Sequence, residues 1–198
     1  FAIGVAKMTV GGLGNNIFNP ALVGRAALLV AFPAQMTTWP KIGQWETYLD
    51  AETGATPLSI ISSAIRLVDA SMLDQLPSSF ELFLGSSSGG AGAMGEICGL
   101  ALLFGLAFML YNRIITWHIP TSILGTVFIF SGLMHLSNPV YPDPISVLFT
   151  GGLMLGAIFM ATVYVTSPMT PKGQIIYGVA IGVLTIIIRN WGAYPGGM

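Results

Sequence analysis

The chain has 198 residues, of which 54% are hydrophobic and only 8% are charged, with a mean hydropathy of +0.78 and a net charge of −1. A soluble domain carries about 25% charged residues, so this chain cannot cover a water-facing surface. The near-neutral charge and the lack of any run of Lys or Arg give no reason to expect nucleic-acid binding. The single cysteine, Cys98, excludes a disulfide framework within the chain.

The apolar segments predict membrane-spanning helices. A spanning helix needs about 17–25 residues, and none of the segments has the polar face of a surface helix. The predicted spans are residues 20–36, 97–111, 119–136, 145–165 and 174–188, with residues 1–6 as the end of another. We expect the short segments 97–111 and 174–188 to extend into their flanks. The predicted fold is an all-α, polytopic transmembrane bundle, and residues 1–198 are interpreted as one membrane domain of a longer chain.

Glycines recur inside these segments at a spacing that favours close helix packing. Gly152 and Gly156 form one pair four residues apart, and Gly178 and Gly182 form another. Small residues at this spacing let two helix backbones approach each other closely. Tight packing is therefore favoured over a separate dimerisation motif.

Charges in the connections predict the orientation of the chain in a cell membrane. Basic residues favour the cytoplasmic side. Lys7, Arg113 and Lys172 are therefore predicted inside, whereas the acidic connection 37–96 and Asp143 are predicted outside. Arg189 is expected to be an exposed exception on the outer side.

The long connection, residues 37–96, is predicted to contain a helix and a loop. Thr suits the N-cap and Pro the first position of a helix, so Thr56 and Pro57 predict a helix over residues 58–72. Residues 78–93 are rich in Ser and Gly and are predicted to be flexible loop.

Thr56 also stands out chemically. Gly54, Ala55 and Pro57 around it are too small to hide its hydroxyl, and Asp50 could bind a metal or the hydroxyl. One interpretation is a helix cap with no further role. The other is covalent attachment of a phosphate-bearing group, which the N-terminus of a helix favours electrostatically. The two interpretations are compatible.

Two further segments precede predicted spans with glycines and polar side chains. Asn15 and Asn19 lie before the first span and could cap a broken helix or form a polar cradle for an ion or ligand. Glu96 could be a functional ionisable group or a carboxylate that interacts with a helix dipole. His118 and His135 lie at predicted helix ends, and their spacing does not predict a metal site.

Residues 50–58, Asp-Ala-Glu-Thr-Gly-Ala-Thr-Pro-Leu, resemble the flavinylation motif of the NqrB/RnfD family of membrane subunits. Other segments are similar to that family in the same order. They are Gly-Asn-x-x-Phe-Asn-Pro-Ala at 14–21, Gly-x-x-Gly-Glu at 92–96, Ile-Thr-Trp-His-Ile-Pro at 115–120 and Thr-Ser-Pro-Met-Thr-Pro-Lys-Gly at 166–173. The resemblance runs from about residue 11 to residue 195 and is stronger to the RnfD branch.

The resemblance implies that FMN is joined to Thr56 through a phosphoester. The residues implied to form the recognition sequence for a flavin transferase are Asp50, Thr53, Gly54, Ala55, Pro57 and Leu58. It further implies two related five-helix halves and a second, noncovalent riboflavin whose site no motif fixes. The family pattern has an acidic residue where this chain has Val163, so no ion-conducting carboxylate is carried over to that position.

The implied function is that of an inner-membrane redox subunit, not catalytic alone, in the Rnf complex. That complex moves electrons between ferredoxin and NAD and pumps Na⁺ or H⁺. The implied partners are the flavin-bearing RnfG, the membrane subunits RnfA and RnfE, and the peripheral RnfB and RnfC. Trp39, Trp45, Tyr48 and Phe80 are candidates for packing on the flavin ring. The alternatives are a channel or transporter that uses Asn15, Asn19 and Glu96 as pore groups, and a scaffold that anchors redox subunits.

Overall fold

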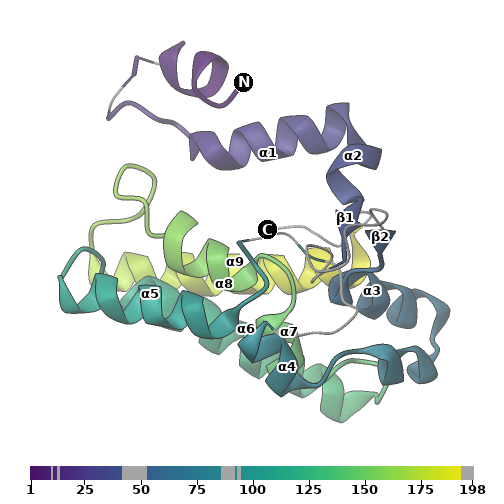
Figure 1. Ribbon diagram of the computed structural model, residues 1–198. Coiled ribbons are helices and arrows are strands. Elements are labelled where there is room, and N and C mark those ends of the chain that lie inside the picture. The colour runs from purple at the N-terminus through teal and green to yellow at the C-terminus, as the bar shows by residue number, and fades with distance from the viewer. Residues whose placement is uncertain (10, 13, 42–52, 86–91, 93–94, 193–198) are drawn as a thin grey trace.

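The computed structural model describes residues 1–9, 11–12, 14–41, 53–85, 92 and 95–192 (Figure 1). The helices are α1 (Pro20–Ala31), α2 (Pro33–Thr37), α3 (Pro57–Leu67), α4 (Ser79–Leu84), α5 (Gly99–Tyr111), α6 (His118–Ser137), α7 (Pro144–Phe149), α8 (Leu153–Leu155) and α9 (Pro171–Trp191). Shorter helical segments of π or 3₁₀ type are η1 (Gly4–Met8), η3 (Ala70–Gln75) and η4 (Gly156–Met160). Strands β1 (Trp39–Pro40) and β2 (Thr53–Gly54) form an antiparallel pair, which the all-α prediction did not include.

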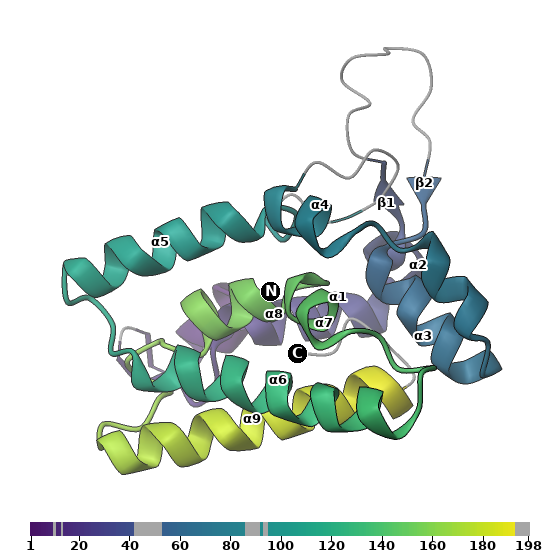
Figure 2. The same cartoon turned by 90° about the horizontal axis from the view of Figure 1, so that it is seen from below.

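The two longest helices, α6 and α9, confirm two of the predicted spans by length and composition. They have 20 and 21 residues, and each has a mean hydropathy of 1.6 over its most apolar window. They lie side by side, as both views show (Figures 1 and 2). Helix α9 extends beyond residues 174–188 at both ends, as the sequence predicted.

Glycines on α9 permit this close contact. A Cβ atom added at Gly182 would lie 2.9 Å from Cβ of Thr126 and 3.2 Å from the carbonyl oxygen of Ile123, both on α6. Gly178 meets Ser122 of α6 in the same way. The predicted role of this glycine pair in close backbone packing is therefore confirmed.

The core lies between α6, α9 and the segment that follows α7. Ile123 and Val127 of α6 have no exposed surface, and neither do Leu153 and Ala157 after the α7 end. Ile186 of α9 packs into the same cluster. The core therefore holds the segment between α7 and η4 against both α6 and α9.

Residues 145–165 do not form the single predicted span. Helix α7 ends at Phe149, Gly151 takes a left-handed φ of +65°, and the chain resumes as α8 and the π-helical η4. Glycine adopts this backbone conformation without steric cost. The prediction was wrong because it treated Gly151 as one of several glycines within a continuous helix.

Helix boundaries in the first half also differ from the predictions. The segment 20–36 divides at Phe32 into α1 and α2, since Pro33 cannot continue the first helix. Helix α5 begins at Gly99 and is capped by Cys98, so the expected extension of residues 97–111 is absent.

The connection 37–96 contains more helix than expected. Helix α3 ends at Leu67, because Val68 adopts a left-handed conformation with φ of 54°, and not at residue 72 as predicted. Helix α4 lies where loop was predicted and begins with a reciprocal capping box between Ser78 and Glu81. These two side chains satisfy backbone N–H groups at the start of the helix.

Figure 2 shows how the elements group at two ends of the molecule. The α5–α6 connection and the start of α9 lie at one end. Helix α3 lies at the other end, near the end of α9. The start of α3, with Thr56, is therefore placed where α9 ends, far from where it begins.

Candidate functional site

Thr56 lies at the N-terminus of α3, as predicted. Its backbone is extended (φ −74°, ψ 150°), and its Oγ1 accepts a hydrogen bond of 3.1 Å from the backbone N–H of Ser59. Pro57 occupies the first turn. Helix α3 has 11 residues, so the partial positive charge of its first turn acts at the Thr56 hydroxyl.

The residues before Thr56 are held in an extended conformation by strand pairing. Gly54 pairs with Trp39 and Thr53 with Pro40. Thr53 and Ala55 are exposed, whereas Thr56 is partly buried. The residues directly beside Thr56, Ala55 and Pro57, carry only small side chains.

The other residues of the flavinylation motif, and the aromatic candidates for flavin packing, differ in burial and position. Leu58 is buried, and Gly54 and Pro57 are partly buried. Of the aromatic candidates, Trp39 lies opposite Gly54, and Phe80 is exposed on α4. Asp50, Trp45 and Tyr48 lie outside the described residues.

Helix α3 packs on the bundle through its apolar face. Leu58 and Ile61 are buried and line a cavity of about 20 Å³, together with Val147, Thr150 and Arg189. This volume suits about one water molecule. An isoalloxazine ring does not fit there, whereas the helix N-terminus and the Thr56 hydroxyl fit a phosphoester.

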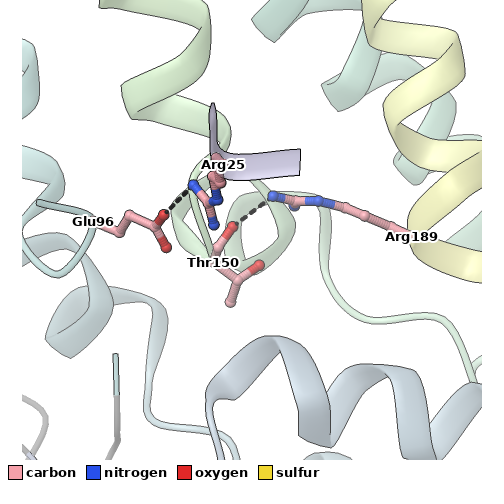
Figure 3. Close-up of polar contacts among 4 residues, drawn as sticks. All are labelled: Arg25, Glu96, Thr150 and Arg189. Atoms are coloured by element: carbon pink, nitrogen blue, oxygen red, sulfur yellow. Dashed lines mark hydrogen bonds and ion pairs between the residues drawn. The ribbon is translucent and has the colours of Figure 1, made fainter. Parts of the chain in front are cut away.

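Arg189 corrects a sequence prediction, because its side chain is buried and not exposed. One terminal nitrogen donates to the carbonyl of Val147 at 3.0 Å. The other donates to the carbonyl of Thr150, also at 3.0 Å (Figure 3). These carbonyls belong to the last turn of α7 and to the break after it. The signal in the sequence was a cation within an apolar segment, which is retained only where it finds partners.

Glu96 and Arg25 form an ion pair of 3.2 Å on the other side of the break. The carboxylate side chain is 13% exposed and the guanidinium 37%. Glu96 also interacts electrostatically with Arg189. Figure 3 shows the three charged side chains converging on the segment that contains Thr150. Cys98, and not Glu96, caps α5.

The two asparagines are placed differently. The Asn19 side chain accepts a hydrogen bond from the Ala21 N–H and donates one of 3.2 Å to the carbonyl of Met160. It therefore caps α1 and ties it to η4, whereas Asn15 is exposed. Among the described residues, no hydrogen bond or ion pair joins either asparagine to Glu96.

The segments 115–120 and 166–173 meet at the opposite end of the molecule. Thr116 Oγ1 donates to Gln174 Oε1 at 2.9 Å, and Gln174 Nε2 donates to the carbonyl of Pro168 at 3.1 Å. His118 stacks on Trp117 at the start of α6. The described part of the chain holds no group of three His, Cys, Asp or Glu side chains that could bind a metal ion.

Comparison with known proteins gives one family and a consistent set of relatives. The model of the NQR2, RnfD, RnfE family matches residues 1–198. The D subunit of the Na⁺-translocating ferredoxin:NAD⁺ oxidoreductase complex of Acetobacterium woodii is 45% identical over 197 residues, covering 100% of this chain and 56% of the relative. The D subunit of the proton-translocating ferredoxin:NAD⁺ oxidoreductase complex of Clostridium ljungdahlii is 42% identical over 203 residues, covering 100% and 59%.

A third relative, the D subunit of the ion-translocating oxidoreductase complex of Stutzerimonas stutzeri, is 38% identical over 216 residues. The match covers 98% of this chain and 60% of that protein. The chain thus spans a little over half the length of these curated relatives.

Proposed function

The chain belongs to the NQR2, RnfD, RnfE family of membrane proteins, and from that premise we propose that it acts as the RnfD subunit of an ion-translocating ferredoxin:NAD⁺ oxidoreductase complex. The support is the match along the whole chain together with the names of the similar proteins. The names of two relatives differ in the ion, Na⁺ in one and the proton in the other, at similar identity. Overall similarity therefore does not distinguish the two ions.

Within this function, the chain carries FMN esterified to the Thr56 hydroxyl. The observation that carries the proposal is the position of this hydroxyl, at the start of an 11-residue helix beside small neighbours. When bound, FMN supplies the electron-transfer chemistry, while the protein supplies position and electrostatics. A second, noncovalent riboflavin belongs to the same proposal.

The protein's own residues would act on the phosphate and on the position of the group. The N–H groups of the first turn of α3 favour a negative charge at Thr56. The covalent link would replace diffusion with a high local concentration of the carrier. Pairing of Gly54 with Trp39 limits the directions in which the segment before Thr56 can move.

The proposed partners follow from the family. A flavin transferase would recognise Asp50, Thr53, Gly54, Ala55, Pro57 and Leu58. The other partners would be RnfA, RnfB, RnfC, RnfE and RnfG, and the segment around Thr56 would face the outside of the cell membrane. Asn15, Asn19 and Glu96 remain proposed polar groups on an ion path, with Glu96 paired to Arg25 in this structure.

Mass spectrometry of the peptide that contains Thr56 tests the attachment directly. We expect the added mass of an FMN phosphoester on Thr56 and a fluorescent band on a denaturing gel. Thr56→Val should abolish both, because it removes the attacking oxygen, whereas Thr38→Val, at an exposed threonine outside the motif, should leave both unchanged. A bare peptide from protein matured in its native host would contradict the proposal and favour a channel or a scaffold.

A further inference from the structure

Helix α3 is held at two places, one on the break after α7 and one at the end of α9. Near its first turn, Leu58 packs against Gly151, where an added Cβ would lie 2.9 Å from a Leu58 methyl carbon. In its last turn, Arg66 donates a hydrogen bond of 2.7 Å to the carbonyl of Gly192, just after α9. The position of α3 therefore depends on the break after α7 and on α9.

Arg189 lies close to the same glycine. One of its terminal nitrogens would lie 3.2 Å from a Cβ at Gly151, and both donate to carbonyls that flank the break. Gly151 has a left-handed backbone, so the turn that receives Leu58 is not part of a regular helix. The guanidinium of Arg189 holds this turn through the carbonyls of Val147 and Thr150.

We propose that Arg189 is a positioning residue for the flavin-attachment helix. It fixes the turn at Thr150 and Gly151 on which Leu58 rests, and it thereby fixes the start of α3 and Thr56 relative to the bundle. The link to flavin depends on the function proposed above, whereas the link to α3 does not. Arg189 acts through the backbone and does not contact Thr56 in any hydrogen bond among the described residues.

The side-chain chemistry explains why arginine is used. A planar guanidinium presents several donors in a rigid fork, so it can reach two carbonyls at once. A lysine would keep the charge but has a single ammonium on a flexible stem. A methionine would leave both carbonyls without their charged donor inside the protein.

Hydrogen–deuterium exchange of α3 in the assembled complex tests this role. In Arg189→Met, exchange of the α3 amides (57–67) should rise by about tenfold or more, since hydrogen bonds to a charged group are lost. The amides of α6 should keep their protection. Fluorescence anisotropy of the bound flavin should fall in the same sample. Arg189→Lys should restore part of both signals.

Two further variants serve as a control and as a check against misfolding. Ile187→Ala changes a residue of α9 that is 41% exposed and does not line the cavity beside α3, and it should leave α3 protection unchanged. Ile61→Ala loosens the α3 side of the same interface outside the attachment motif, and should raise α3 exchange even if Arg189→Met fails to assemble.

Unchanged α3 protection in Arg189→Met would overturn the proposal, as would a rise in exchange shared equally by α6. If Arg189→Met does not assemble, full wild-type protection of α3 in Arg189→Lys would overturn it instead. Faster α3 exchange with unchanged flavin anisotropy would overturn the link to the flavin. A wild-type protein with no flavin on Thr56 would instead refute the proposed function and leave the α3 result standing.

Discussion

Gly152 shows how one small residue admits a charge pair to the break in the bundle. A Cβ at this position would lie 2.7 Å from Oε1 of Glu96 and 3.6 Å from a terminal nitrogen of Arg25. The carboxylate occupies the space that any larger residue at Gly152 would need. The position of the Glu96–Arg25 ion pair therefore depends on the absence of a side chain at Gly152.

Gly152→Ala is expected to displace Glu96 from its partner. Overpacking and disturbed pairing together should lower the free energy of unfolding by about 1–3 kcal/mol. Thermal unfolding followed by size-exclusion fluorescence in detergent would measure the loss. Gly125→Ala is the matched control, since nothing lies within 4 Å of an added Cβ at Gly125 in α6. Equal thermal midpoints for both variants would show that Glu96 does not need this glycine.

Individual residues differ in how far their sequence context predicts them. Thr56 and Pro57 were predicted as the start of a helix because capping is decided by neighbours in sequence. Arg189 was misplaced because its partners, the carbonyls of Val147 and Thr150, lie about 40 residues earlier. Glu96 was predicted to be either a functional ionisable group or a carboxylate that interacts with a helix dipole, and its partner Arg25, 71 residues away, was not predicted.

At the level of elements, α6 and α9 make the most extensive contact among the helices that the structure describes. Small residues on α9 face Ser122 and Thr126 of α6, so the two backbones approach closely. In a membrane, association of helices relies on such packing, because lipid is as apolar as the side chains. The pair should therefore be sensitive to added volume on its contact face and tolerant of it elsewhere.

Gly182→Val tests that sensitivity. The added methyl groups would meet Cβ of Thr126 and the carbonyl of Ile123, and α9 would have to move away from α6. We expect a loss of about 1–3 kcal/mol in the free energy of unfolding, together with faster proteolysis of the folded protein. Gly125→Val places the same β-branched side chain in open space on α6. If the control lost as much stability as Gly182→Val, helix propensity and not packing would be the cause.

Apolar length predicted the regular helices and failed where the backbone breaks. Residues 119–136 were found because an uninterrupted apolar run has the length of a span, and residues 174–188 because a shorter run was expected to extend into its flanks. Residues 145–165 are equally apolar, yet they divide at Gly151, since glycine composition does not separate a packing contact from a left-handed turn. The capping box at Ser78 and Glu81 was a readable signal that was missed.

For the molecule as a whole, the charge pattern and the structure agree on which segments share an end. The α5–α6 connection and the start of α9 contain Arg113 and Lys172, both predicted to be cytoplasmic. Exposed Tyr111 and Trp117 belong to the same region, as expected for aromatic residues at a membrane interface. Segments predicted outside, including α3, gather at the opposite end. This grouping agrees with the predicted division of the segments between two ends. Which end faces the cytoplasm stays a prediction.

Thiol labelling with a membrane-impermeant reagent decides which end faces outward. In a Cys98→Ser background, which keeps a capping side chain, Gln75→Cys in η3 should react in intact cells. Met169→Cys, at a site that is 91% exposed before α9, should react only after the membrane is opened. Both positions are accessible in the folded chain, so a difference between them reports the membrane and not burial. The reverse pattern would place Thr56 on the cytoplasmic side, because α3 and η3 lie at the same end, and an outward-facing flavin carrier would then be excluded.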